Sequence, residues 1–119
     1  MLYNIYMLSK KYRFHSRGGV RFVYQKGKTI RSAKMSLTVM PNSRGFTRFA
    51  VVVSKKVNKT AVGRNRIRRR IYEALRVNFE HIPMQKDYIF TVFTKEILTM
   101  PFPELEKLLG DLVADSSVL

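Results

Sequence analysis

Arginine is concentrated between Arg64 and Arg76, in a segment whose apolar residues recur at helical spacing. At 100° per residue, one side of a helix would carry a largely aliphatic set: Ile67, Ile71, Ala74, Leu75 and Asn78. The other side would carry a largely polar set: Asn65, Arg66, Arg69, Tyr72 and Arg76. A helix of this kind packs on a core with its aliphatic stripe and presents guanidinium groups to solvent.

The position of the cations in this segment indicates what they bind. Arg64 and Arg66 lie near the predicted start of the helix, where the helix dipole makes a cation unfavourable by roughly 0.3–1 kcal/mol. A phosphate there would meet free backbone N–H groups and guanidinium groups together. The alternative is an ordinary solvated face, but the dense arginine with little acid nearby favours phosphate binding.

The charge of the whole chain agrees with this interpretation. Its 119 residues include 23 Lys and Arg against 8 Asp and Glu, a formal net charge of +15. This length predicts a single domain over residues 1–119 that buries roughly two-thirds of its unfolded surface. A hydrophobic content of 45% argues against disorder. The expected partner is a polyanion, with nucleic acid the first choice and a membrane surface the second.

Several classes of protein are excluded or disfavoured. The chain has no cysteine, which excludes disulfides and thiolate metal sites. No apolar run approaches the ~20 residues of a membrane-spanning helix, and the start lacks the features of a signal peptide, so we expect a cytoplasmic protein. His15 and His81 are the only histidines and the acids are scattered, so we predict neither a catalytic residue nor a metal site on this chain.

Hydrophobic periodicity and turn residues predict three helices and three strands. The first helix is expected at 18–25 and the last at 102–114. The helix between them should start between residues 58 and 64 and end before Pro83. The strands are expected at 34–40, 46–53 and 87–94. The first strand alternates polar and apolar residues and should be half-buried. Because residues 41–45 are rich in turn formers, a short hairpin is the simplest connection between the first two strands.

Aromatic residues allow two interpretations. Phe49, Tyr88, Phe90 and Phe93 lie in predicted strands and are expected in the core. Tyr24, on the first predicted helix, could either stack on a nucleobase or pack against the protein.

In their order along the chain, these segments resemble the protein subunit of bacterial ribonuclease P. Residues 51–57, Val-Val-Val-Ser-Lys-Lys-Val, are similar to the family's strand ending in Val-Ser-Lys-Lys. Residues 64–69, Arg-Asn-Arg-Ile-Arg-Arg, match its signature helix at a suitable distance along the chain. Residues 20–27 resemble its first helix, and residues 87–89 the start of its last strand. Met7-Leu8 is similar to a typical family start, so residues 1–6 are expected to be an extension or a misassigned start.

The resemblance implies an α+β fold, a single two-layer α/β sandwich of order αβββαβα with an unusual left-handed βαβ crossover, against the usual hand. It also implies a non-catalytic protein subunit. The RNA subunit would hold Mg²⁺ and cleave precursor tRNA to leave the mature 5′ end. The arginine helix and a nearby loop would face the catalytic RNA, and a cleft between the sheet and that helix would hold the single-stranded 5′ leader. The protein alone is expected to be monomeric.

Site residues follow from the resemblance position by position. The RNA-facing motif would be Arg64, Asn65, Arg66, Arg68 and Arg69, with phosphate contacts from Lys55 and Lys56. The leader cleft would be lined by Val20, Tyr24 and Thr38. Val20 and Thr38 stand where relatives often carry aromatic residues, so only Tyr24 keeps a ring for base stacking.

Two other functions share some of these features. A ribosomal or other rRNA-binding structural protein would also be small and basic with an arginine helix, but the ordered Ser-Lys-Lys and Arg-Asn-Arg signals favour ribonuclease P. A DNA-binding module could read bases with the arginine helix. The four arginines among residues 66–70 favour phosphate contacts over base contacts, and no second helix-turn-helix element is visible.

Overall fold

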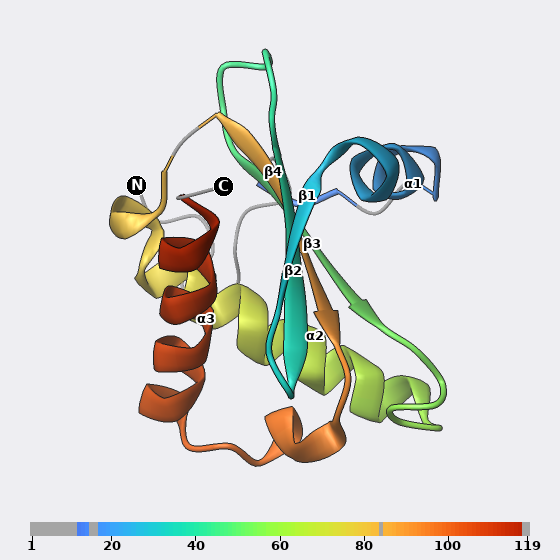
Figure 1. Ribbon diagram of the computed structural model, residues 1–119. Helices are drawn as coiled ribbons and strands as arrows, with labels where there is room; N and C mark the ends of the chain where they lie inside the picture. Colours follow the sequence, from blue (N-terminus) through green and yellow to red (C-terminus); the bar gives the residue numbers. More distant parts are fainter. Residues whose placement is uncertain (1–11, 15–16, 84, 118–119) are drawn as a thin grey trace.

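The structure is a computed structural model that describes residues 12–14, 17–83 and 85–117. Its elements, in chain order, are α1 (Arg17–Lys26), β1 (Lys28–Arg31), β2 (Met35–Pro41), β3 (Arg48–Val53), α2 (Ala61–Val77), β4 (Lys86–Val92) and α3 (Phe102–Ser116). Two short 3₁₀ turns, η2 (Phe79–His81) and η3 (Lys95–Leu98), flank β4. The order αβββαβα that the resemblance implies is confirmed (Figure 1).

The four strands form one sheet in the order β1-β2-β4-β3. Strand β2 is antiparallel to both β1 and β4, whereas β3 is parallel to β4. The predicted hairpin between β2 and β3 is therefore wrong, because β4 lies between them. Tyr88, Ile89 and Phe90 of β4 are fully buried, and a strand that is apolar on both sides is most stable at the centre of a sheet. Helix α2 makes the crossover that carries the chain from β3 to the neighbouring parallel strand.

The two faces of the sheet are covered by different helices (Figure 1). Helices α2 and α3 cover one face, and the main core lies there around Leu37, Phe49 and Phe90. Helix α1 lies on the other face over a smaller cluster that includes Val23 and Ile89. Because α1 shields the second face, β2 is not half-buried as predicted, and its polar side chains are also buried.

Helix α2 begins within the predicted range and is fixed at its start by side chains. The hydroxyl of Thr60, the N-cap residue, accepts a hydrogen bond from the Gly63 amide at 3.0 Å. Asn58 accepts hydrogen bonds from both the amide and the hydroxyl of Thr60. A Cβ on Gly63 would lie 2.3 Å from the Asn58 Oδ1 atom, so a larger residue there would displace the Asn58 side chain from Thr60.

The aliphatic stripe of α2 is confirmed, but one residue was assigned to the wrong side. Ile67, Ile71, Ala74 and Leu75 are all buried, as expected. Tyr72, predicted to be exposed, is also buried. The reason is the segment before α1, which runs beside β3 through a bridge between Arg13 and Phe49. The Arg13 guanidinium lies 5.4 Å from the centre of the Tyr72 ring and covers it.

The other elements agree with the sequence except at two places. Helix α3 starts next to Pro101, within its predicted range, and packs Leu105, Leu109 and Leu112 on the core. The four-residue strand β1 has no counterpart in the periodicity because its residues are mostly exposed and polar. Phe93 is not a core residue: β4 ends at Val92, and the Phe93 side chain remains 38% exposed.

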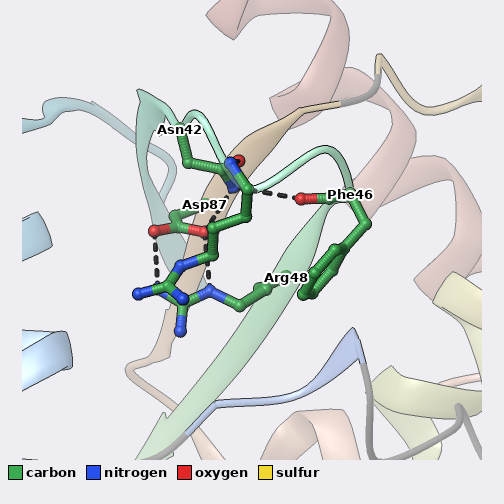
Figure 2. A network of polar contacts seen from close by, with 5 residues as sticks. Asn42, Phe46, Arg48 and Asp87 are labelled. Carbon is green, nitrogen blue, oxygen red and sulfur yellow. Dashed lines mark hydrogen bonds and ion pairs between the residues drawn. The ribbon is translucent and has the colours of Figure 1, made fainter.

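A buried ion pair ties the loop between β2 and β3 to the central strand (Figure 2). Arg48 donates two hydrogen bonds to the carboxylate of Asp87, at 3.0 and 2.8 Å. The Asn42 amide donates to the same carboxylate at 2.8 Å and to the Phe46 carbonyl at 3.2 Å. The Arg48 guanidinium also lies 4.3 Å from the centre of the Phe14 ring. This arrangement compensates the buried charge and fixes the loop without a direct β2–β3 pairing.

Candidate nucleic-acid interface

The solvent-facing side of α2 carries side chains that are available for a ligand. Asn65, Arg66 and Arg69 are exposed, as predicted. Arg68 is half-buried and donates a hydrogen bond to the side chain of Asn65, which fixes the direction of its guanidinium. Guanidinium groups held on a rigid helix can form paired hydrogen bonds with phosphate at a small entropic cost.

Three other arginines of α2 have structural partners. Arg64 donates to the carbonyl groups of Asn58 and Lys59, at 3.0 and 3.1 Å, and so holds the loop before the helix. Arg70 donates to the Ile97 carbonyl at 2.6 Å and ties α2 to η3. Arg76 forms a two-point ion pair with Glu73. The arginine segment thus contains some arginines that are exposed to a ligand and others that hold neighbouring parts of the protein. The sequence pattern did not distinguish the two kinds.

The lysines after β3 lie next to this helix, in a tight turn. The amides of Val57 and Asn58 both donate to the Ser54 carbonyl, at 3.1 and 3.3 Å. Lys55 and Lys56 are exposed on this turn, a few residues before the start of α2. The turn and the exposed side of α2 therefore supply positive charge from two consecutive elements.

A hollow of about 500 Å³ lies between α1, β3 and α2. Its lining is apolar over most of its surface and basic at two points: Phe14, Val20, Arg21, Tyr24, Ala50, Val51, Val52, Val53 and Arg68. Two of the residues carried over from the resemblance, Val20 and Tyr24, are thus brought together. Arg68 belongs both to this lining and to α2, so the hollow and the arginine side form one continuous surface.

Tyr24 is held at one end and accessible along its ring. Its hydroxyl hydrogen-bonds to the Thr91 side chain on β4, while the side chain is 40% exposed. The ring therefore neither sits in the core nor projects freely into solvent. A ring fixed in this way loses little further entropy when a base stacks on it.

Thr38, the third residue carried over for the leader cleft, does not line the hollow. Its side chain is 1% exposed and its hydroxyl lies 2.9 Å from the hydroxyl of Thr29 on β1. The end of α1 covers it: a Cβ on Gly27 would lie 3.0 Å from the Thr38 methyl group. The structure thus places Thr38 beneath the end of α1, where it supports the helix.

Titratable groups form no recognisable catalytic arrangement in the described residues. His81 is exposed at the end of η2, whereas His15 lies outside the described residues. No three His, Asp or Glu side chains gather as a metal site within the described part of the chain. Burial raises the pKa of Tyr72 above its ordinary value. The charge of Arg13, a hydrogen bond with the Val51 backbone and the charge of Arg68 act in the opposite direction but do not cancel this rise. This phenol therefore stays neutral at physiological pH.

Sequence reasoning missed two residues of the hollow, Arg21 and Phe14. Arg21 follows Val20 on α1, and an exposed cation on a short helix carries no distinctive signal. Phe14 lies before α1 and is one of the residues that line the hollow. Its amide donates a hydrogen bond to the Phe49 carbonyl at 2.9 Å, which holds this segment beside β3. Only the pairing of this segment with β3 could have revealed it.

Comparison with known proteins gives one consistent result. The family model described as Ribonuclease P matches residues 8–116. A "Ribonuclease P protein component" from Chloroflexus aurantiacus is 37% identical over 99 residues, which cover 83% of this chain and 73% of the relative. Another with the same name, from Symbiobacterium thermophilum, is 32% identical over 113 residues and covers 94% of this chain and 96% of the relative.

Solved structures show the same similarity. The ribonuclease P protein of Staphylococcus aureus superposes with a TM-score of 0.75 at 26% identity, over 87% of this chain and 93% of that one. The Thermotoga maritima protein gives a TM-score of 0.77 at 23% identity, over 85% and 94%. None of the described helices has the length and apolar character needed to cross a membrane.

Proposed function

The chain belongs to the bacterial ribonuclease P protein family, whose members take part in tRNA processing. We propose that two parts of its surface bind two different RNAs. The exposed side of α2 and the turn at Lys55 and Lys56 bind the catalytic RNA. The hollow between α1, β3 and α2 binds the single-stranded 5′ leader of precursor tRNA. Together they assist the RNA-catalysed cleavage that produces the mature 5′ end.

The observation that carries this proposal is the position of Arg68. Its side chain lines the hollow, while Arg66 and Arg69 on the same helix face solvent. An RNA bound on the helix and a second RNA strand in the hollow would therefore meet at the positive charge of Arg68. The catalytic RNA and the leader can then lie next to each other, as cleavage at the junction between the leader and the mature tRNA requires.

The hollow has the chemistry of a single-strand site. Its apolar lining and the partly exposed Tyr24 ring can contact bases, and Arg21 and Arg68 can contact the phosphates. Neither kind of contact depends on a particular base sequence. The proposed leader site would therefore accept leaders of different sequence.

The catalytic step is assigned to the RNA subunit. Mg²⁺ would be held by the RNA, and we assign no proton transfer or metal-dependent step to residues of this chain. The protein would contribute positive charge and positioning, as a monomer acting in the cytoplasm. Membership of the ribonuclease P family favours this role over that of a ribosomal protein.

The proposal is tested by comparing precursor and mature tRNA. The reconstituted holoenzyme should bind precursor tRNA with a single-stranded leader more tightly than mature tRNA, and the catalytic RNA alone should show a smaller preference. An equal preference with and without the protein would contradict a leader site on this chain. Cleavage by the protein without RNA, lost on His81→Ala, would contradict the assignment of catalysis.

A further inference from the structure

Phe93 is an exposed aromatic side chain at the end of β4, outside the hollow described above. It is followed by Thr94 and Lys95, and its amide donates a hydrogen bond to the Lys34 carbonyl at 2.9 Å. The backbone at this point is therefore fixed, although the side chain is 38% exposed. Aromatic side chains are enriched at binding interfaces relative to the rest of a protein surface.

Positive charge surrounds this ring. The Arg31 guanidinium lies 5.4 Å from the ring centre. On another side, Phe93 shares a hollow of about 560 Å³ with residues of the loop before α2 and the turn after β4: Lys56, Val57, Asn58, Lys59, Thr94 and Lys95. In Figure 1 the loop before α2 lies at the lower right and the turn after β4 at the lower centre, and residues of both segments line this hollow.

The lysines of this hollow, Lys56, Lys59 and Lys95, form no ion pair with the acids that the structure describes. The acid nearest in sequence, Glu96, accepts a hydrogen bond from the Thr94 hydroxyl at 3.3 Å. The hollow thus combines one stacking surface with three cations, the combination that binds an unpaired nucleotide.

From this geometry we infer a nucleotide site at Phe93, in which an unpaired base of the catalytic RNA stacks on the ring and its flanking phosphates contact Lys56, Lys59 and Lys95. The inference rests on the proposed function and adds a contact to a base, whereas the exposed side of α2 offers cations for phosphates. The catalytic RNA is the expected ligand because Lys56 belongs both to this hollow and to the turn proposed to bind that RNA. The leader hollow contains neither Phe93 nor any of these lysines.

Tryptophan fluorescence can test this site directly, because the chain contains no tryptophan. Phe93→Trp places a single reporter in the site, and Val77→Trp places a matched reporter on an exposed residue at the other end of α2. Adding catalytic RNA should quench the reporter at position 93 and leave the one at position 77 unchanged. A single-stranded leader oligonucleotide should quench neither reporter.

Affinity measurements complete the test. Phe93→Ala should weaken binding of the catalytic RNA roughly 5- to 150-fold, the range for loss of one stacked base, and Phe93→Tyr should bind like the wild type. Both variants should melt at the wild-type temperature.

If the catalytic RNA binds with full affinity but neither quenches the reporter nor responds to Phe93→Ala, the site is wrong and the proposed function stands. If the leader oligonucleotide quenches the reporter, the assigned ligand is wrong. If the wild-type protein does not bind the catalytic RNA, both proposals fail.

Discussion

At the scale of single residues, Tyr24 offers the sharpest test of the proposed leader site. The ring is 40% exposed beside the hollow and its hydroxyl is held by Thr91. Tyr24→Ala should weaken binding of precursor tRNA to the holoenzyme by roughly 1–3 kcal/mol, because a stacking surface is lost. Binding of mature tRNA should change little. Tyr24→Phe is the matched control, since it keeps the ring and removes only the hydrogen bond. Equal losses for precursor and mature tRNA would mean that the ring serves the fold rather than the leader.

A second residue-scale prediction concerns alkaline pH. Burial raises the pKa of Tyr88 to about 12, and its hydroxyl donates to the Pro83 carbonyl at 3.0 Å. A pKa raised above the ordinary value of 10 favours the folded state below pH 10, and this contribution is lost as the pH rises through 12. The free energy of unfolding should therefore fall by about 1 kcal/mol at pH 11 and about 2 kcal/mol at pH 12.

The control for this prediction is Tyr88→Phe, which cannot ionise at that position. Urea unfolding at pH 9, 11 and 12 should show a smaller loss of stability for this variant than for the wild type. Deprotonation of lysines affects both proteins and cancels in the comparison. Parallel pH profiles would show that folding does not raise the pKa of Tyr88.

At the scale of elements, we expect one side of α2 to serve stability and the other to serve RNA binding. Ile71 is fully buried, so Ile71→Ala should lower the free energy of unfolding by about 2–5 kcal/mol. Arg66→Ala and Arg69→Ala remove exposed side chains and should change it by less than about 0.5 kcal/mol. Arg66 is beyond the first turn of α2, which begins at Ala61, so the helix dipole affects it little.

Binding should show the opposite order. Both arginine variants should bind the catalytic RNA more weakly and reduce holoenzyme activity at low Mg²⁺, where the charge of the protein matters most. Thermal melts paired with RNA titrations on the three variants measure both effects. Arginine variants that unfold as readily as Ile71→Ala, or that bind RNA as the wild type does, would contradict the assignment of the two sides.

The buried ion pair between β3 and β4 gives a further prediction at this scale. Asp87→Ala leaves the Arg48 guanidinium with no carboxylate partner and should destabilise the fold by about 3–5 kcal/mol. The double change Asp87→Leu with Arg48→Met replaces both charges by apolar groups and should recover most of this loss. Chemical denaturation of the two variants measures the difference. A double variant no more stable than Asp87→Ala would show that the carboxylate does more than neutralise Arg48.

The elements were largely predictable from the sequence, whereas their pairing was not. The stripe of α2, the leucines of α3 and the apolar strand β4 have strong local patterns, and each was found near its predicted place. The prediction of a β2–β3 hairpin was wrong because β4, which comes later in the chain, separates the two strands. Local turn residues carry no information about that later strand. The burial of Tyr72 and of Thr38 could not be predicted for a related reason. Each side chain is covered by a segment distant in sequence, the first by Arg13 and the second by the end of α1.

At the scale of the whole molecule, the proposed RNA contacts lie on neighbouring elements. The turn at Lys55, the exposed side of α2 and the Phe93 hollow are formed by consecutive or adjacent elements, whereas α3 carries acids such as Glu104 and Asp111. A net charge of +15 distributed in this way would attract a polyanion and orient the protein toward it. Affinity should therefore depend strongly on salt.

The expected size of the salt effect follows from the number of phosphates contacted. If about six phosphates are neutralised, the affinity for the catalytic RNA should fall roughly 10³-fold between 50 and 200 mM salt, because each contact releases condensed counterions. Removing one phosphate contact, as in Arg69→Ala, should reduce the slope of log affinity against log salt by about 1. Phe93→Ala should instead weaken binding at every salt concentration with little change in slope, because stacking releases few ions. A flat plot for the wild type would reject phosphate-dominated binding, and a reduced slope for Phe93→Ala would show that its effect comes from the lysines around it.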